Sequence, residues 1–189
     1  GFIAEANELK AEILQEFASI EKDLVINIEK TESSENGLSK ENSAQIIRML
    51  KSAHNGVYRM SPDVADLVEA SNNIARVELK DGSLKILNLT RSSVDSSKFN
   101  VANQLKAVFE LGGLNVEFSG SYPGWKPNPN SEILRIMEKL YTDKFGSKPN
   151  VVACHAGLEC GIIGAHYPKM EMVSFGPTIK GAHSPDERA

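Results

Sequence analysis

The chain alternates between stretches with apolar residues at helical spacing and shorter stretches with apolar residues at every second position. In the first twenty residues, apolar side chains recur three or four positions apart, which is typical of one face of a helix. Residues 24–28 are then rich in β-branched side chains and predict a strand. After a polar loop, Asn42 with Gln45 resembles a capping box for a second helix that should end near Gly56. The apolar positions of these two helices are Leu9, Ile13, Leu14, Phe17 and Ile20, then Ile46, Ile47 and Leu50.

The middle of the chain carries the pattern of a β-hairpin. Apolar and polar residues alternate toward Val77 and Leu79, Asp81-Gly82 interrupts them, and the alternation resumes at Leu84. Asp-Gly between two alternating runs favours a two-residue turn of type I′. Two antiparallel strands joined by this turn are therefore expected.

A third helix and a further strand should follow the hairpin. The helix is stopped by Gly112-Gly113, and residues 114–118 predict a strand. The resulting order, β-α-β-β-α-β, is that of the ferredoxin-like split βαβ unit. We therefore predict an α+β protein whose residues 1–120 form a ferredoxin-like domain with a leading helix. The apolar face of the third helix holds Val101, Leu105, Val108 and Phe109.

The composition changes sharply at residues 120–130. The sequence GSYPGWKPNPN contains three prolines, two glycines and the only tryptophan, which indicates a domain boundary or hinge. A helix capped by Ser131 and short buried strands at residues 151–153 and 172–175 are expected beyond it. About 60 residues with so few apolar strand positions cannot easily bury a core alone. Residues 121–189 are therefore predicted to be a hinge and the C-terminal part of an incomplete α/β domain.

Composition and charge narrow the functional classes. The chain has 189 residues, of which 41% are hydrophobic and 24% charged, and a net charge of −4, which is typical of a globular protein with one or two domains. Its lysines are spread singly and form no basic stripe, so no nucleic-acid partner is expected. No apolar run approaches the roughly 20 residues that cross a bilayer, and the first residues lack the features of a signal peptide. We expect a cytoplasmic protein without a membrane role.

The candidate chemistry is concentrated in residues 154–188. This segment holds three of the four histidines, both cysteines and several acids between glycine-rich turns. Groups of this kind are more often placed for coordination or proton transfer than for packing. Cys154 and Cys160 lie six positions apart around His155, which matches none of the short zinc patterns. We interpret them as small buried thiols in a reducing compartment rather than as a structural zinc site.

Three motifs carry a resemblance to a known family. HAGLECG begins at His155, YPGW begins at Tyr122, and GPTIKGAHSPDER spans residues 176–188. In these motifs the chain resembles the bacterial aminoacyl-histidine dipeptidases, also called Xaa-His dipeptidases. A weaker similarity includes LTRSSVDS at residues 89–96. The resemblance covers nearly the whole chain but only the C-terminal portion of a family member.

The resemblance implies a metallopeptidase that removes the N-terminal residue from dipeptides ending in histidine, carnosine-like substrates included. Its two-metal catalytic domain is interrupted by a lid domain of ferredoxin-like fold. Two metals, usually zinc with manganese or cobalt as alternatives, share a water and a bridging carboxylate, and a glutamate is the general base. The upstream ligands and that base have no counterpart in residues 1–120. We therefore expect no catalytic residue in this chain, no tightly bound metal on it alone, and no activity without the rest of the enzyme.

The resemblance also implies roles for five residues. His183 matches the family's C-terminal metal-ligand histidine, and a neutral imidazole suits zinc. Arg91 matches an arginine for the terminal carboxylate of the substrate, whose two oxygens a guanidinium can bind together. His155 and Glu159 lie where related peptidases line the substrate pocket. Tyr122 walls the site at the hinge.

Plainer interpretations stand beside these roles. Arg91 could pair with Asp95 at a strand end, Glu159 could face solvent in a glycine-rich loop, and His183 could be an ordinary surface residue. For the whole chain, the competing hypothesis is a non-catalytic ferredoxin-like module whose edge strand pairs with a copy of itself or another protein. Because lids of related peptidases often dimerise, the partner hypotheses are a small dipeptide substrate and a homodimer through the lid.

Overall fold

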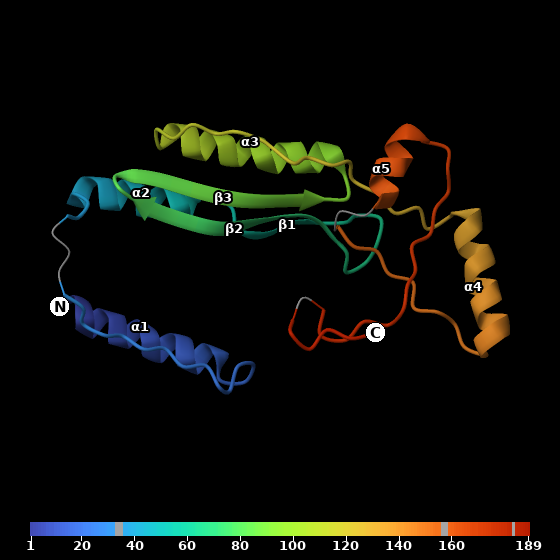
Figure 1. Ribbon diagram of the computed structural model, residues 1–189, viewed down its shortest axis with the longest axis horizontal. Helices are drawn as coiled ribbons and strands as arrows, with labels where there is room; N and C mark the ends of the chain where they lie inside the picture. The colour runs from blue at the N-terminus through green and yellow to red at the C-terminus, as the bar shows by residue number, and fades with distance from the viewer. Residues whose placement is uncertain (33–35, 156–158, 183) are drawn as a thin grey trace. The chain divides into compact units, whose positions relative to one another are not determined.

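The secondary structure mixes helices and strands, as the sequence predicts. The computed structural model describes residues 1–32, 36–155, 159–182 and 184–189. Contacts divide the chain into two compact units, Gly1–Lys40 and Glu41–Ala189. The elements within the described ranges are α1 (Phe2–Phe17), α2 (Lys40–Ser52), β1 (Gly56–Met60), β2 (Val68–Lys80), β3 (Ser83–Ser92), α3 (Asp95–Leu111), α4 (Glu132–Phe145) and α5 (Glu159–His166) (Figure 1). None of these helices is long and apolar enough to span a membrane.

The first unit consists of α1 and a largely extended segment. α1 confirms the helix predicted at the start of the chain. Residues 24–28, predicted to be a strand, lie outside the helices and strands of the structure. A β-branched run gives a preference for extended backbone, but a strand forms only where a neighbour completes its hydrogen bonds. That strand prediction is therefore wrong for the described unit.

The second unit contains an antiparallel sheet in the order β1-β2-β3. The predicted hairpin is confirmed, because Lys80 pairs with Ser83 and leaves Asp81 and Gly82 as the two-residue turn. Their φ angles of 50° and 75° are both positive, as a type I′ turn requires. β1 was not predicted, because apolar and polar residues do not clearly alternate along its five positions. Its buried and exposed side chains do not alternate either.

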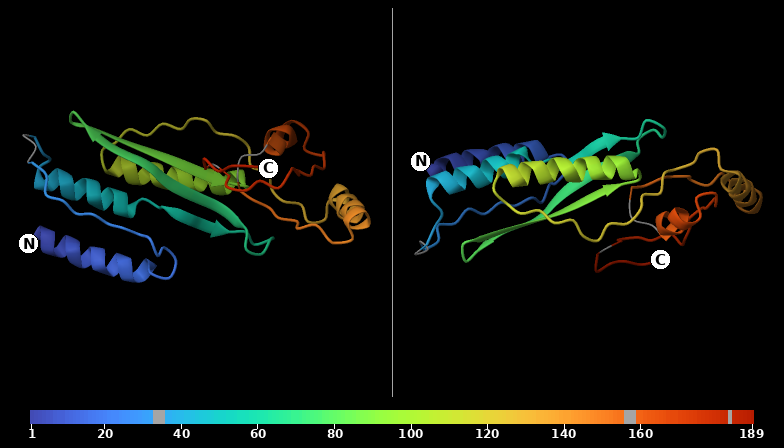
Figure 2. Two further views of the ribbon diagram at one scale, coloured as in Figure 1. Left: turned by 60° about the horizontal axis from the view of Figure 1, so that its bottom comes forward. Right: turned by 90° about the horizontal axis from the view of Figure 1, so that it is seen from above.

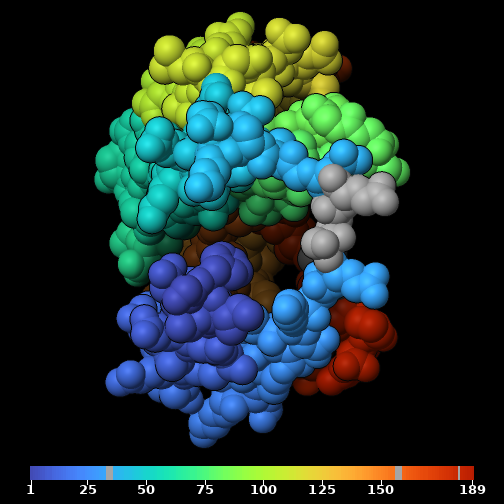
Figure 3. Space-filling view, turned by 90° about the vertical axis from the view of Figure 1, so that its left-hand side faces the viewer, coloured from blue at the N-terminus to red at the C-terminus, as the bar shows by residue number. Residues whose placement is uncertain are grey.

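A small core lies between one face of this sheet and the helices α2 and α3. α3 runs along the sheet in both further views (Figure 2). In the space-filling view, α3 and the chain after it (yellow) cover α2 and the strands (cyan and green) from one side (Figure 3). The predicted helical spacing puts three α3 side chains into the core, as expected. The buried residues of the core are Met49, Ala53, Ala70, Val101, Leu105 and Phe109.

The contact between α2 and the end of α3 explains two details of the sequence. α2 begins at Lys40, so the predicted capping box at Asn42 lies inside the helix and not at its start. The Gln45 side chain instead donates to the Gly112 carbonyl at 3.0 Å. A Cβ at Gly112 would lie 2.3 Å from the Met49 sulfur, so a larger residue there would require the Met49 side chain to move.

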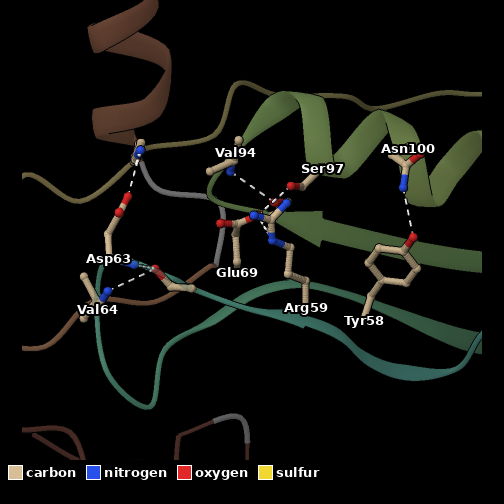
Figure 4. Close-up of polar contacts among 11 residues, drawn as sticks. Tyr58, Arg59, Asp63, Val64, Glu69, Val94, Ser97 and Asn100 are labelled. Atoms are coloured by element: carbon tan, nitrogen blue, oxygen red, sulfur yellow. Dashed lines mark hydrogen bonds and ion pairs between the residues drawn. The ribbon is translucent and has the colours of Figure 1, made fainter.

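A buried carboxylate near the start of β2 links this strand to β1 and to α3 (Figure 4). Glu69 is 5% exposed. It accepts a hydrogen bond from the Ser97 hydroxyl of α3 at 2.5 Å and lies 3.3 Å from Nε of Arg59 on β1. Its backbone carbonyl accepts from the Ser93 N–H at 3.1 Å. The sheet and the first turn of α3 are therefore joined by one side chain.

The predicted β-α-β-β-α-β order is not confirmed. The described chain from α2 onward runs α-β-β-β-α up to Leu111, and residues 114–118 lie outside its helices and strands. Leu114 and Val116 nevertheless pack against the core. Side chains that face the core at every second residue are typical of a strand. A strand of a sheet also needs a neighbouring strand that completes its backbone hydrogen bonds. The fold is therefore mixed α and β, with a three-stranded antiparallel sheet in the described residues.

α4 confirms the helix predicted after the proline-rich segment. Its residue Gly146 has a φ of 71°, the left-handed conformation that commonly ends a helix. At its start, the predicted cap Ser131 makes no side-chain hydrogen bond to the helix. The Glu171 carboxylate accepts from the N–H groups of Glu132 and Ile133 instead, at 2.9 and 3.1 Å. The helix start is therefore capped from a distant part of the chain.

The predicted strands at residues 151–153 and 172–175 are wrong. Neither segment belongs to a strand of the described chain. Cys154 is exposed and Cys160 half-buried, so the prediction of two buried thiols is wrong as well. A strand needs a neighbour that completes its hydrogen bonds, and the described residues give neither segment such a neighbour. Past α5, Lys180 and Arg188 form an isolated antiparallel bridge.

Candidate functional site

The arginine predicted to bind a carboxylate lies near the end of β3. The antiparallel register places Arg91 directly opposite Ser71 of β2. Because side chains alternate along a strand, this pair lies on the face opposite to the buried Ala70. Arg91 is exposed and forms no ion pair with an acid in the described ranges. Its guanidinium is therefore available to a ligand.

Asp95, the alternative partner of Arg91, is engaged elsewhere. Its Oδ1 accepts from the Lys98 ammonium at 2.8 Å and from the Gly124 N–H at 3.0 Å. Partial burial acts to raise the pKa of Asp95, but the hydrogen bonds from Lys98 and Gly124 and the charge of Lys98 outweigh it, so the pKa lies below its ordinary value. The pairing of Arg91 with Asp95 is thus not found.

Lys98 and two glycines hold the YPGW hinge in place. The nearly buried Lys98 ammonium donates to the Tyr122 carbonyl and lies 5.9 Å from the Tyr122 ring centroid. A Cβ at Gly124 would lie 2.4 Å from the Ser93 carbonyl oxygen, and a Cβ at Gly161 would lie 2.5 Å from that of Pro123. The hinge therefore touches the β3–α3 turn on one side and α5 on the other.

His155 lies beside the strand pair that carries Arg91. Its Nε2 and the Ser71 hydroxyl are 2.8 Å apart. Partial burial and, next, the positive charge of Arg91 hold the pKa of His155 below its ordinary value. A histidine with a lowered pKa is neutral at pH 7. The predicted residues Arg91 and His155 are thus brought together, although 64 positions separate them (155 − 91).

A hollow with a volume of about 300 Å³ opens beside His155. Apart from His155, its walls come from β1, β2 and the residue before β1. They carry amide, hydroxyl and small apolar groups and no formal charge. The hollow is open to solvent, and most of its exposed lining is apolar. Its lining residues are Asn55, Gly56, Val57, Val68, Ser71, Asn72, Asn73 and His155.

The remaining predicted residues have different outcomes. Glu159 is exposed and begins α5, so its predicted position within a loop is wrong. Tyr122 is half-buried at the hinge. His183 lies outside the described residues. Its neighbour Ser184 donates from its hydroxyl to the Gly181 carbonyl at 2.7 Å, inside the segment closed by the Lys180–Arg188 bridge.

The described residues offer no ready-made metal site. No three His, Cys, Asp or Glu side chains lie close enough within the described ranges to hold an ion together. A catalytic zinc normally takes three protein ligands. The described residues therefore do not form a metal site by themselves. No reaction step at a metal ion can be assigned to them.

Sequence reasoning missed Ser71, which joins the two predicted residues. The sequence did hold information on the pairing of Ser71. Counting back along both strands from the hairpin turn predicts which residues lie opposite one another. That count would pair Ser71 with Ser92, whereas a β-bulge between Ile74 and Arg76 moves Ser71 opposite Arg91. An irregularity of one residue thus hid the pair.

Comparison with known proteins gives the class: the chain is homologous to dipeptidases over nearly its whole length. It is 39% identical over 178 residues to the cytosol non-specific dipeptidase of Escherichia coli (strain K12), covering 94% of this chain and 37% of that protein. The crystal structure of aminoacylhistidine dipeptidase from Vibrio alginolyticus matches with a TM-score of 0.85 and 41% identity, covering 98% of this chain and 38% of the other. No protein-family model matches. The resemblance seen in the motifs is confirmed, and the chain spans well under half the length of these relatives.

Proposed function

We propose that this chain is the C-terminal portion of a metal-dependent dipeptidase, a hydrolase that cleaves Xaa-His dipeptides in the cytoplasm. The observation that carries the proposal is that Arg91, which forms no ion pair with an acid in the described part of the chain, lies beside the neutral His155 and an open hollow. Homology to two dipeptidases over nearly the whole chain supports it. The hollow has room for part of a small substrate, and the arginine suits the substrate's free carboxylate.

Each site residue has a distinct proposed role. Arg91 binds both oxygens of the substrate's terminal carboxylate, as a planar guanidinium does well. His155 contributes a further polar contact from the wall of the hollow. Tyr122 and Glu159 line the substrate site near the hinge. These residues bind and orient the dipeptide, while the general base comes from a part of the enzyme that this chain does not contain.

Metal would be held only in the whole enzyme. We propose His183 as one ligand of a site that takes two zinc ions, with manganese or cobalt as alternatives. A bound metal would lower the pKa of a water and supply the nucleophile. Because a single candidate ligand cannot hold a catalytic ion, the chain alone should bind none tightly and should be inactive.

Residues 1–120 would act as the lid, and residues 121–189 would be the hinge and the C-terminal part of the catalytic domain. Leu114 and Val116 pack against the core at alternate positions, which supports a ferredoxin-like lid in which residues 114–118 add a strand. Binding of the substrate carboxylate by Arg91 would draw the lid toward the catalytic domain. This closure would exclude water from the site.

A homodimer through the lid is a second candidate role. The sheet face that carries Arg91 leaves Val57, Leu87 and Leu89 between 43% and 53% exposed. Apolar side chains gathered on one sheet face favour an interface with another protein. Sedimentation of the purified chain tests this role: a concentration-dependent dimer lost in Leu89→Lys supports it, and a monomer at all concentrations rejects it.

One experiment tests the dipeptidase proposal directly. This chain and a version extended by the coding sequence upstream of Gly1 in its gene are assayed with zinc, manganese or cobalt on β-alanyl-histidine and Xaa-His dipeptides. We expect activity only in the longer protein, and His183→Ala should abolish both activity and metal retention. A longer protein that is inert and metal-free would overturn the proposal.

A further inference from the structure

Ser71 and His155 are joined by a hydrogen bond across 84 positions of sequence, with 2.8 Å between Oγ and Nε2. Ser71 is half-buried on β2, and the register sets it opposite Arg91. A serine side chain is short and has a single torsion that aims its hydroxyl. This hydroxyl therefore ties His155 to the strand pair that carries Arg91.

The described residues that line the hollow beside His155 are uncharged. The hollow is walled from the β1 side by Asn55 and Val57 and from β2 by Val68, Ser71 and Asn73, together with the rest of its neutral lining. Arg91 of β3 is the charged group that acts on the ring. In the absence of a ligand, burial and this neighbouring positive charge both favour the neutral imidazole.

We propose that Ser71 is a positioning residue that holds His155 against Arg91, and that a carboxylate bound by Arg91 is gripped by both side chains as His155 takes up a proton. This rests on the proposed function, in which the anion is the terminal carboxylate of a dipeptide. The anion offsets the charge of Arg91 and itself attracts an imidazolium. The proton comes from the buffer, the imidazole becomes imidazolium, and no covalent bond of the ligand changes.

Proton uptake makes carboxylate binding depend on pH with a defined sign. A ring that is protonated more readily with the anion bound has a higher pKa in the complex than in the free protein. Each unit of that difference corresponds to about a tenfold change in affinity. For a shift of about one unit, the carboxylate should bind about tenfold more tightly below the free-state pKa than above the pKa in the complex.

Nuclear magnetic resonance of the whole 189-residue chain, with labelled histidine rings, tests the proposal. The His155 signal is identified by its loss in His155→Gln. The probe is acetylglycine, and acetylglycinamide is the uncharged control. We expect acetylglycine to raise the titration midpoint of His155 by about one pH unit, while the amide leaves it unchanged.

Substitutions at position 71 separate positioning from general stability. Ser71→Ala should lose most of the response to acetylglycine, and Ser71→Thr, which keeps a hydroxyl, should retain it. Ser83→Ala is the matched control, because Ser83 is an exposed serine at the hairpin end of β3. The methyl resonances of Val101 in the core report whether each variant is folded.

Two results would overturn the proposal: a midpoint that acetylglycine does not move, or an equal response in folded Ser71→Ala. The dipeptidase proposal fails separately. If the longer protein cleaves dipeptides while His155 does not respond, only this inference is wrong. If His155 responds while the longer protein is inert, the inference about Arg91 and His155 stands and the dipeptidase proposal is wrong.

In an active longer protein, Ser71→Ala should raise KM more at low pH than at high pH, with kcat nearly unchanged.

Discussion

At the scale of single residues, stability depends on buried charges whose partners come from other elements. Glu69 is held by Arg59 and Ser97 from the neighbouring strand and helix. Removing its carboxylate leaves the Ser97 hydroxyl without this acceptor and removes the side-chain link between β2 and α3. Glu69→Ala should lower the free energy of unfolding by about 2 kcal/mol.

Urea denaturation of the purified chain measures this difference. The matched control is Glu78→Ala, which removes an exposed pair with Arg76 and should change the free energy of unfolding by less than about 0.5 kcal/mol. Equal losses in both variants would contradict the role given to burial.

The lowered pKa of Asp95 predicts a pH dependence with a defined sign. A carboxyl whose pKa is lower in the folded than in the unfolded chain stabilises the fold above its ordinary pKa of 3.8, and this contribution is lost as pH falls through the folded value. Asp95→Asn should therefore flatten the fall of the melting temperature in that acidic range. Melting curves from neutral pH to pH 3 measure it, and parallel profiles of variant and parent would refute it.

At the scale of elements, local signals predicted more than distant ones. The helical spacing of Val101 and Leu105 and the Asp81-Gly82 turn each specify structure within a few residues, and both predictions are confirmed. The strand predicted at residues 24–28 failed because a strand depends on its neighbours. The site shows the same limit: the motifs singled out Arg91 and His155, but the contact through Ser71 depends on a bulge and on a segment 84 positions away.

The start of α4 gives a test of capping from a distance. Glu171 accepts from two N–H groups at the helix start, whereas the hydroxyl of Ser131 is buried without a partner in the described structure. Glu171→Ala should cost about 1 kcal/mol and speed hydrogen exchange of the Glu132 and Ile133 amides. Ser131→Ala, which in an ordinary N-cap would cost a similar amount, should be nearly neutral. The reverse ranking of the two variants would disprove this assignment.

At the scale of the whole molecule, the C-terminal part has too little core for the apolar surface it carries. α4 has no buried residue, and Ile136, Leu140 and Phe145 are 46%, 56% and 59% exposed. In the proposed enzyme this surface would face the catalytic domain. Isolated, the chain should bind an apolar fluorescent dye, and Leu140→Glu should reduce the fluorescence at least twofold. If the dye does not fluoresce with the chain, the prediction that residues 121–189 belong to an incomplete domain would be contradicted.

The two glycines at the hinge have a consequence for the tolerance of the chain to substitution. Gly124 and Gly161 do not have positive φ angles, so what they need is room and not an unusual backbone. Even alanine, the smallest side chain, would meet a carbonyl oxygen there. Gly146, by contrast, needs only the left-handed conformation that asparagine also accepts. In a library of all single substitutions, position 146 should therefore keep asparagine, while positions 124 and 161 should keep nothing but glycine.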